Sequence, residues 1–433
     1  MRMHMMNAHA RRSAAALLML GLTATSACNS LLDVSNPASV PAADLNDPLL
    51  MPTLEAAAIQ TLQCGVVNYA ATAGMLSGEF WSSNGFVNNH PWEWRGVTEI
   101  KSNDGSCNYG RNSTFMGFYT PLQTARYQLE NTFERTEKFS DAEVPTRAKI
   151  LTEMRAYAGY AYLLLGEGMC SMAVDGGPEM TKAQVWAMAK DRFTDAIARA
   201  TALNDASLLN MARAGLARTN LDLGDMAGAA TAARLVPTNF VKTAEYSEQV
   251  QARENRFYDL NIRDDLISVT PPYYNLTVLL IGQTTPSADP RVPVRNVGRA
   301  GDDNVTPYWQ TSKYTPATSA TATAPIPIAS WVEAKLILAE AVGNTTEGQA
   351  AVDSVRATKN IQPLVVNPGD DWTTLIIEER RRQLFAEGQR YGDMLRKNLP
   401  FQSGTNRKGQ TYSNLTCVPL PDVETRNNPN FGG

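Results

Sequence analysis

Apolar residues recur every three or four positions through much of the chain after about Leu54, which is the period of a helix with one buried face. One such stripe has spacings of four, three, four and three, and consists of Ile150, Met154, Tyr157, Ala161 and Leu164. This pattern predicts a helix that ends at Gly166 or Gly168. A second stripe on the next predicted helix consists of Val185, Met188, Phe193, Ile197 and Ala200.

The following segment predicts a pair of antiparallel helices. Residues Leu208–Leu223 are rich in Ala and Leu and stop at Gly224-Asp225, and Met226–Leu235 resume the helix before Pro237. Small residues at the crossing let two helices approach closely, and a glycine ends the first one without strain. The pair resembles a tetratricopeptide repeat, although any antiparallel helical hairpin rich in Ala would give the same pattern.

Helical periodicity is lost from about Asn239 to Thr323, where Pro, Gly, Thr and Asn are dense. This composition predicts loops with short strands. Helices are expected again over Ser330–Val342, Thr346–Thr358 and Thr373–Lys397, and an irregular segment follows Pro400. The sequence thus predicts a mainly α protein. Its helical core is expected at about 53–236 and 328–398, and its irregular lobe at about 237–327 and 399–433.

The N-terminal residues form the successive regions of a secretory signal. Basic residues are followed by the short apolar run Ala14–Leu22 and then by small residues before Cys28. A small residue before a cysteine at this place predicts lipidation of Cys28, although Thr25 stands where Leu is commoner. Ordinary cleavage nearby, with Cys28 as a simple thiol, is the alternative. We therefore predict a signal peptide over 1–27 and a single domain over 28–433.

Four further cysteines follow Cys28, and an even number in an exported chain favours disulfides. They are Cys64, Cys107, Cys170 and Cys417. Three pairings exist, and we favour Cys64–Cys107 with Cys170–Cys417. Buried free thiols are the alternative.

Composition and motifs exclude several kinds of chemistry. The net charge of −4 is mild and there is no basic stripe, which excludes nucleic acid as an expected partner. Of the three histidines only His90 lies outside the signal segment, so a zinc site built from several histidines is excluded. No P-loop, HExxH or strand-linked GxGxxG occurs. We expect no cofactor, no metal and no catalytic residue, and we interpret Asp302-Asp303-Asn304 as a solvated turn rather than a calcium loop.

Four segments, in order along the chain, resemble the SusD-like (RagB/SusD) family. The mature start reads CNSLLDVSNP, and Asp289–Ala341 carries Asp-Pro-Arg, Lys-Tyr and a Glu-Ala-rich helix. Ile376–Arg396 is similar to the family's Glu-Arg and Glu-Gly-x-Arg-x-x-Asp-x-x-Arg helix, and Val418–Asn430 to its ending.

This resemblance implies a tetratricopeptide-like helical superhelix with an irregular, ligand-facing part. It also implies a surface lipoprotein of the outer membrane that is not an enzyme. Such a protein captures an oligosaccharide, or sometimes a peptide, for a SusC-like TonB-dependent β-barrel transporter. The cysteine set and the segment GEGMCSMAVDGG depart from the family pattern, which affects ligand identity more than fold.

The charged helix predicted within Ile376–Arg396 has two interpretations. Its polar residues are Glu379, Arg380, Glu387, Arg390, Asp393 and Arg396. Glu387–Arg390 and Asp393–Arg396 are three apart, which places each pair on neighbouring helical positions. A structural ion-pair network is favoured over a catalytic or anion site. We therefore expect Arg390→Ala to lower the melting temperature without changing ligand affinity.

Aromatic residues are the candidate ligand contacts, because sugars pack their C–H faces on aromatic rings and hydrogen-bond to polar side chains. The segment Gly78–Gly96 offers Trp81, Asn84, Trp92, Trp94 and Arg95. Two further pairs are Tyr273-Tyr274 and Tyr308-Trp309. The competing interpretation is that half of these rings anchor loops to the core.

Binding of a nutrient is the leading functional hypothesis. A helical surface glycoside hydrolase or lyase would require two essential carboxylates at a set separation. A protein-interaction adaptor that uses tetratricopeptide-like grooves is the third hypothesis.

Overall fold

The computed structural model describes residues 44–101, 104–107, 116–314 and 322–431. By internal packing the chain divides into Met1–Leu50 and Met51–Gly433, and each unit is described by itself. The first contributes two short 3-10 turns, η1 (Asp44–Asn46) and η2 (Pro48–Leu50). Cys28 and the predicted signal peptide lie outside the described residues.

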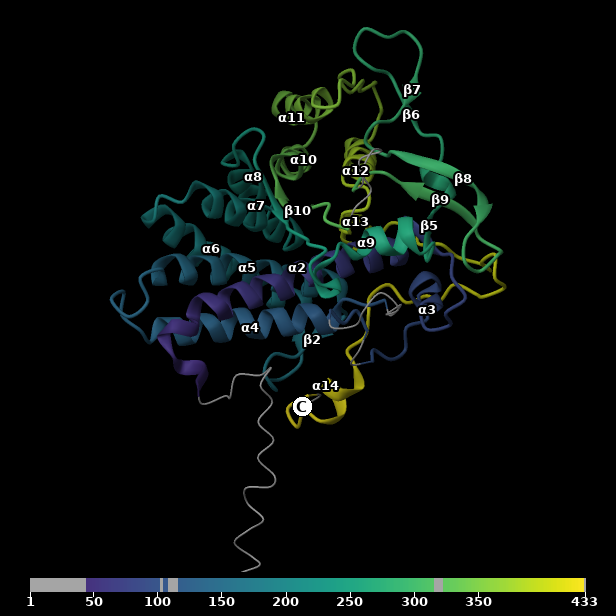
Figure 1. Ribbon diagram of the computed structural model, residues 1–433. Coiled ribbons are helices and arrows are strands. Elements are labelled where there is room, and N and C mark those ends of the chain that lie inside the picture. Colours follow the sequence, from purple (N-terminus) through teal and green to yellow (C-terminus); the bar gives the residue numbers. More distant parts are fainter. Residues whose placement is uncertain (1–43, 102–103, 108–115, 315–321, 432–433) are drawn as a thin grey trace, which may run out of the picture. The chain divides into compact units, whose positions relative to one another are not determined.

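Helices dominate the second unit, as the sequence predicted (Figure 1). The longer ones are α2 (Met51–Leu76), α4 (Tyr119–Glu137), α5 (Arg147–Gly168), α6 (Lys182–Ala202), α7 (Ala206–Asp222), α8 (Met226–Arg234), α10 (Trp331–Val342), α11 (Thr346–Ala357), α12 (Trp372–Gln383) and α13 (Gln389–Arg396). Short helical pieces are α3 (His90–Trp94), η3 (Gln251–Arg253), α9 (Arg256–Tyr258), η4 (Asp259–Arg263), η5 (Pro271–Tyr273) and α14 (Asp422–Arg426).

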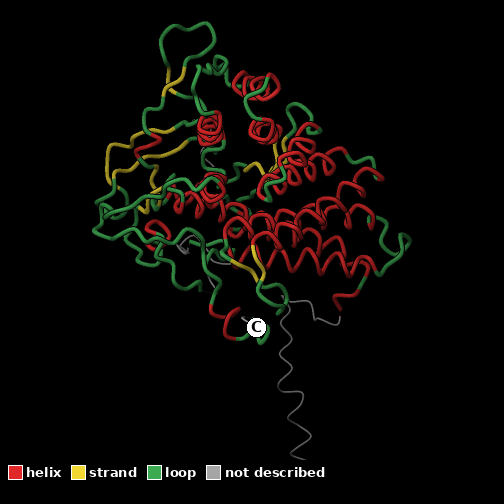
Figure 2. Tube along the Cα trace, turned by 180° about the vertical axis from the view of Figure 1, so that it is seen from behind, coloured by secondary structure: helices red, strands yellow, loops and turns green. Residues whose placement is uncertain are grey.

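The long helices pack in chain order. Each of α2, α4, α5, α6, α7 and α8 contacts the next, and α8 contacts α10 across the irregular segment that separates them in sequence. Figures 1 and 2 show this row of helices lying side by side. The apolar stripes face inward, since Ile150 and Phe193 are fully buried. Helix α5 ends at Gly168, which confirms one of the two predicted ends.

The predicted helical hairpin is α7–α8. Gly224 between the helices has φ +76°, a conformation that glycine adopts without strain. Asp225 then caps α8 by accepting a hydrogen bond from Gly228 N at 2.8 Å. Ala214 and Ala229 are buried in the hairpin. Small side chains at the crossing therefore set the close packing of α7 on α8.

The irregular lobe consists of short antiparallel ladders joined by loops, again as expected. Its strands are β4 (Val241–Ala244), β5 (Ile267–Val269), β6 (Thr277–Val278), β7 (Ser287–Ala288), β8 (Val294–Ala300), β9 (Pro307–Thr311) and β10 (Ile326–Ser330). Three further strands lie within the expected helical core, β1 (Phe80–Ser82) between α2 and α4, and β2 (Ser171–Met172) and β3 (Met180–Thr181) between α5 and α6. The strands pair as β1–β5, β10–β4, β2–β3, β6–β7 and β8–β9.

The expected helical core is interrupted between α5 and α6, and over a longer stretch between α2 and α4. Between α2 and α4 the chain leaves the helical row and forms β1 and the short α3. Strand β1 pairs with β5 of the irregular lobe, with Phe80 opposite Val269 and Trp81 opposite Ser268. The segment is rich in Gly, Ser and Asn, which disfavour a helix interior and leave backbone groups free for this pairing.

The prediction of one helix over Thr373–Lys397 was wrong. The chain breaks between α12 and α13, where Ala386 has φ +64° and Gly388 has φ +78°. Tertiary contacts hold the break open. Lys313 Nζ donates to the carbonyl oxygens of Gln383 at 3.2 Å and Phe385 at 2.6 Å. Ala386 N donates to Glu79 Oε1 at 3.2 Å.

The expected ion-pair network is present and includes the predicted Asp393–Arg396 pair, but Glu387 does not pair with Arg390 as the spacing had indicated. Asp393 pairs with Arg380 at 2.9 Å and with Arg396 at 2.7 Å, and all three side chains are nearly buried. Glu387 lies in the break and pairs with Lys313 at 2.7 Å rather than with Arg390. Arg390 therefore stands outside the network in which the sequence placed it.

Both favoured disulfides are present. Cys64–Cys107 joins α2 to the segment before α4, and Cys170–Cys417 joins the end of α5 to the C-terminal segment. Backbone hydrogen bonds accompany the second one, because Cys170 N donates to Val418 O at 2.8 Å and Val418 N donates to Gly168 O at 3.1 Å. No helix in the described ranges is long and apolar enough to cross a bilayer.

Candidate aromatic binding site

Three of the predicted aromatic residues remain partly exposed and lie on neighbouring elements of the irregular lobe. They are Trp81 on β1, Tyr274 just after η5 and Trp309 on β9, and we call them the aromatic platform. The rings of Tyr274 and Trp309 stack with centroids 3.8 Å apart and planes 10° apart. The Tyr274 hydroxyl donates to Val269 O at 2.8 Å, which fixes the edge of the stack.

Strand β5 connects Trp81 to the stacked pair. Ser268 is the partner of Trp81 in the β1–β5 ladder. The Ser268 hydroxyl oxygen accepts a hydrogen bond from Trp309 N at 2.9 Å and donates to Pro307 O at 2.7 Å. One buried serine thus holds β1, β5 and β9 together beneath the platform.

Arg407 covers the Trp81 ring, with its guanidinium carbon 4.4 Å from the ring centroid. The guanidinium donates to Glu93 Oε1 at 2.6 Å and to Thr306 Oγ1 at 2.6 Å. Glu93 in turn accepts from Ser82 N at 2.7 Å and so is tied to β1. These contacts fix Arg407 in place, and its side chain keeps only 14% of its surface exposed.

The phenols next to Arg407 remain protonated. Burial raises the pKa of Tyr274 to about 12, against the opposing effect of Arg407. Burial also raises the pKa of Tyr412 to about 12, and its hydroxyl lies 3.4 Å from Glu93 Oε1. Both phenols therefore act as neutral hydrogen-bond donors at the edge of the platform.

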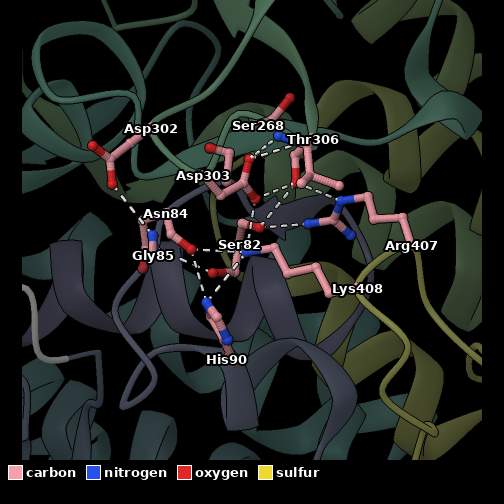
Figure 3. Close-up of polar contacts among 12 residues, drawn as sticks. Ser82, Asn84, Gly85, His90, Ser268, Asp302, Asp303, Thr306, Arg407 and Lys408 are labelled. Atoms are coloured by element: carbon pink, nitrogen blue, oxygen red, sulfur yellow. Dashed lines mark hydrogen bonds and ion pairs between the residues drawn. The ribbon is translucent and has the colours of Figure 1, made fainter.

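A polar network fixes the loops around the platform (Figure 3). Lys408 Nζ contacts Asp303 Oδ2 at 2.8 Å and donates to Asn84 O at 2.8 Å. Asp303 accepts from Thr306 Oγ1 at 2.6 Å, and Asp302 accepts from Gly85 N at 3.2 Å. Three sequence-distant segments are thereby joined.

This network revises the interpretation of Asp302-Asp303-Asn304 as a solvated turn. Burial alone would raise the pKa of Asp303, but hydrogen bonds from Lys408 and Thr306 outweigh it and bring the pKa to about 2. Asp303 is therefore an ionised loop anchor, while Asp302 and Asn304 are exposed. No cluster of three or more His, Cys, Asp or Glu side chains suited to a metal occurs in the ranges that the structure describes.

His90 belongs to the same network. Its Nε2 lies 2.8 Å from Asn84 O and 3.2 Å from Lys408 Nζ, and its Nδ1 lies 3.3 Å from Gln410 Nε2. Burial lowers its pKa, with Lys408 adding to the effect. His90 is thus a neutral side chain that links loops.

The other predicted ligand contacts lie in the core. Trp92 is 2% exposed and packs on Phe118, and Tyr273 packs on Phe385 with centroids 4.8 Å apart. Tyr308 is fully buried and hydrogen-bonds to the carbonyl oxygen of Asn261. These three rings anchor loops, which is the competing interpretation given above.

Asn84 and Arg95 also have structural roles. Asn84 Nδ2 donates to Leu266 O at 2.8 Å, and its Oδ1 accepts from Phe86 N at 2.9 Å. Arg95 donates to the carbonyl oxygens of Gln402 at 2.6 Å, Ser413 at 2.9 Å and Leu415 at 3.1 Å. The guanidinium of Arg95 therefore secures the C-terminal segment and has little capacity left for a ligand.

Trp94 is partly exposed, but its ring folds over Gly96, where an added Cβ would overlap it at 1.4 Å. It is not among the rings that the structure brings to the platform.

Sequence reasoning missed Glu93, Arg407 and Tyr412. Glu93 stands in the Trp-rich segment, where an acidic residue beside two tryptophans was a weak signal. Arg407 and Tyr412 lie in an irregular segment more than 300 positions from Trp81, and no local pattern marks them. Only the tertiary fold brings them together.

Comparison with known proteins gives consistent findings. A family model for the SusD family matches residues 240–431. No curated protein matches the chain. A SusD superfamily protein from Bacteroides vulgatus has 15% sequence identity and a TM-score of 0.64, with 89% of this chain and 99% of that chain covered.

Two further solved structures are similar. A SusD-like carbohydrate binding protein from Bacteroides fragilis has 15% identity and a TM-score of 0.61, with 87% of this chain and 98% of that chain covered. A laminarin binding SusD-like protein has 12% identity and a TM-score of 0.54, with 88% and 98% covered. Residues 240–431 therefore belong to the SusD family, and the described chain has the fold of that family's solved members.

Proposed function

We propose that this protein binds an oligosaccharide at the aromatic platform without cleaving it. The stacked Tyr274–Trp309 pair, partly exposed beside Trp81, is the observation that carries the proposal. Aromatic faces bury the C–H surfaces of a sugar ring. The phenol oxygens of Tyr274 and Tyr412, whose protons are donated to Val269 O and Glu93 Oε1, can accept hydrogen bonds from its hydroxyls. Two proteins of the same fold have names that describe carbohydrate and laminarin binding, which supports this ligand class over a peptide.

The site is prepared for binding in advance. Trp81 is covered by a guanidinium whose hydrogen bonds are made within the protein, and the loops around the platform are joined by ion pairs. A rigid site loses less conformational entropy when a ligand binds. The platform is therefore suited to capture of a ligand.

Surface attachment and delivery complete the proposal. Cys28 would carry the lipid, and the captured oligosaccharide would pass to a SusC-like TonB-dependent transporter in the outer membrane. Two experiments test this part. Cys28→Ala should abolish incorporation of labelled fatty acid, and purification of the tagged protein from membranes should recover a large β-barrel protein.

The binding proposal is tested by titrating a panel of polysaccharides against three variants. Trp309→Ala and Tyr274→Ala should each weaken binding of the recognised polysaccharide by about tenfold, because each removes a stacking face. Tyr127→Ala is the matched control, since Tyr127 is 54% exposed on α4 and lies outside the platform. Melting temperatures measured alongside separate lost binding from lost folding.

The same samples also test the alternative that the protein is a hydrolase. Incubation with each polysaccharide should release no new reducing ends. Cleavage that a single carboxylate substitution abolishes would replace the binding proposal with an enzymatic one. Full affinity in both platform variants would place the site elsewhere.

A further inference from the structure

The ladder of β8 and β9, which lie side by side in Figure 1, places a polar residue opposite Trp309. Asn296 of β8 is the cross-strand partner of Trp309 of β9. Directly opposed residues of an antiparallel pair point to the same face, with their Cβ atoms about 4.5–5.5 Å apart. Tyr308, next to Trp309 in β9, is fully buried on the other face. Asn296 therefore shares the outward face of the ladder with one ring of the platform.

A backbone hydrogen bond fixes the orientation of the Asn296 amide. Gly298 N donates to Asn296 Oδ1 at 2.8 Å. The register of the ladder shifts between Asn296 and Ala300, and Gly298 has φ +83° within that irregularity. Only the oxygen of an amide group can accept from a backbone N–H. The Nδ2 group of Asn296 is therefore directed away from Gly298 N, and it is held there before any ligand binds.

The Nδ2 group of Asn296 is available as a donor. Asn296 is exposed, and its Nδ2 has no hydrogen-bond partner among the residues that the structure describes. The hydroxyl protons of Tyr274 and Tyr412 are already donated within the protein, so these phenols offer a ligand only their acceptor oxygens. Asn296 adds a donor on the Trp309 side of the platform. Donor and acceptors together match sugar hydroxyls, which both donate and accept.

The two cations that lie beside the platform are already paired. Arg407 pairs with Glu93 at 2.6 Å, and Lys408 pairs with Asp303 at 2.8 Å. The two basic side chains keep only 14% and 10% of their surface exposed. An anionic sugar could recruit either cation only by separating a largely buried ion pair, which is costly. A neutral sugar needs no such partner.

We propose that Asn296 is a ligand contact of the platform, where its Nδ2 group donates to a hydroxyl oxygen of a neutral sugar unit that packs on Trp309. The inference rests on the proposed binding of an oligosaccharide. It adds two points to that function: a neutral glycan is the ligand class, and Asn296 is the residue that recognises a ring substituent beside the aromatic face.

Calorimetric titration of the full chain with six polysaccharides tests the ligand class. Laminarin, pullulan, galactomannan and inulin are neutral, whereas polygalacturonate and alginate carry a carboxylate on each sugar unit. We expect at least one neutral polysaccharide to bind. Both anionic ones should bind at least about tenfold more weakly, because the cations beside the platform are already paired.

Variants at Asn296 test the contact itself with the neutral polysaccharide that binds. Asn296→Asp keeps an oxygen that accepts from Gly298 N and removes the donor, so it should weaken binding by about fivefold and leave the melting temperature unchanged. Asn296→Ala also removes the donor and should weaken binding by a similar factor. Arg295→Ala is the matched control, because Arg295 is the preceding residue of β8 and stands opposite Gln310 on the other face of the ladder. That variant should keep the native affinity.

Several results would overturn the inference. Native affinity in both Asn296 variants, with weakened binding in Trp309→Ala, would remove Asn296 from the site and keep the proposed function. An equal loss of affinity in Arg295→Ala would attribute the effect to the ladder rather than to the donor. Tighter binding of polygalacturonate or alginate than of every neutral polysaccharide would show an anionic ligand instead. Absence of any binding by the native chain would defeat both proposals.

Discussion

At the scale of single residues, the motifs that carry the family resemblance have structural roles. Arg291 of the Asp-Pro-Arg motif bridges Asp289 to Glu379 of α12. In the Lys-Tyr pair, Lys313 binds the carbonyl groups of the α12–α13 break, and the Tyr314 hydroxyl donates to Ala386 O at 3.0 Å. These residues join the irregular lobe to the helices.

Glu79 is the buried acid with the clearest consequence. It is fully buried behind the break, and its Oε2 has no hydrogen-bond partner among the described residues. Burial raises its pKa to about 7, although Ala386 N, Lys313 and Arg390 oppose the shift. In the folded protein Glu79 therefore keeps its proton up to a higher pH than in the unfolded chain, where its pKa is near 4.5.

The sign of the resulting pH dependence follows from that difference. The stabilising contribution of protonated Glu79 is fully present below about pH 4.5 and is lost as pH rises through about 7. Glu79→Gln should therefore unfold with a free energy about 1–3 kcal/mol higher than the native chain at pH 8. Near pH 4.5 the two should agree, as denaturant titrations at both values will measure. A variant less stable at pH 8 would show that the ionised carboxylate supports the fold.

At the scale of elements, the break between α12 and α13 determines how the charged residues are arranged. It turns α13 so that Asp393 meets Arg380 across the two helices, while Arg396 reaches Glu340 of α10 at 2.7 Å. Burial would raise the pKa of Asp393, but Arg380 and Arg396 outweigh it and hold the pKa well below its usual range. Three helices are thereby joined by charge.

Removing the central charge should be costly. Asp393→Asn keeps the shape but leaves Arg380 and Arg396 short of a carboxylate, and we expect a loss of about 3–5 kcal/mol in unfolding free energy. Arg390→Ala is the matched control, because Arg390 lies outside the network and should cost less than about 1 kcal/mol. Urea titrations measure both. Equal losses would return Arg390 to the network, as the helical spacing had indicated.

At the scale of the molecule, the two disulfides differ in how much chain they enclose. Cys170–Cys417 has a sequence separation of 247, whereas Cys64–Cys107 has 43. The longer bridge fastens the C-terminal segment, which supplies Arg407 and Tyr412, to the end of α5. The segment that places Arg407 over Trp81 is thus held by a long-range connection.

Loop-closure entropy predicts the order of their effects. Replacing Cys170 and Cys417 together by Ser should destabilise the protein by about 1–2 kcal/mol more than replacing Cys64 and Cys107, because the longer bridge restricts the unfolded chain more. Thermal and denaturant unfolding of the two double variants compares them directly. The reverse order would indicate that native-state packing at Cys64 dominates.

The helical part of the fold was predictable because its information is local. The stripe from Ile150 to Leu164 and the Gly224-Asp225 turn each lie within one or two helices, and period and capping determine them. The disulfide pairing, favoured among three, also held. The single helix over Thr373–Lys397 failed because Lys313 and Glu79, both distant in sequence, provide partners for the backbone where it breaks.

The sequence by itself determined the mainly α class, the irregular lobe and the aromatic candidates. Helical periodicity, turn residues and aromatic residues can each be recognised within a short stretch of sequence. Only the tertiary structure decided which rings are available to a ligand. Trp92 and Tyr308 have the same local character as Trp81 and Trp309, yet the first two are buried and the others are partly exposed. Burial depends on which surface packs over a ring. Arg407, supplied from the far end of the chain, covers Trp81 only in part.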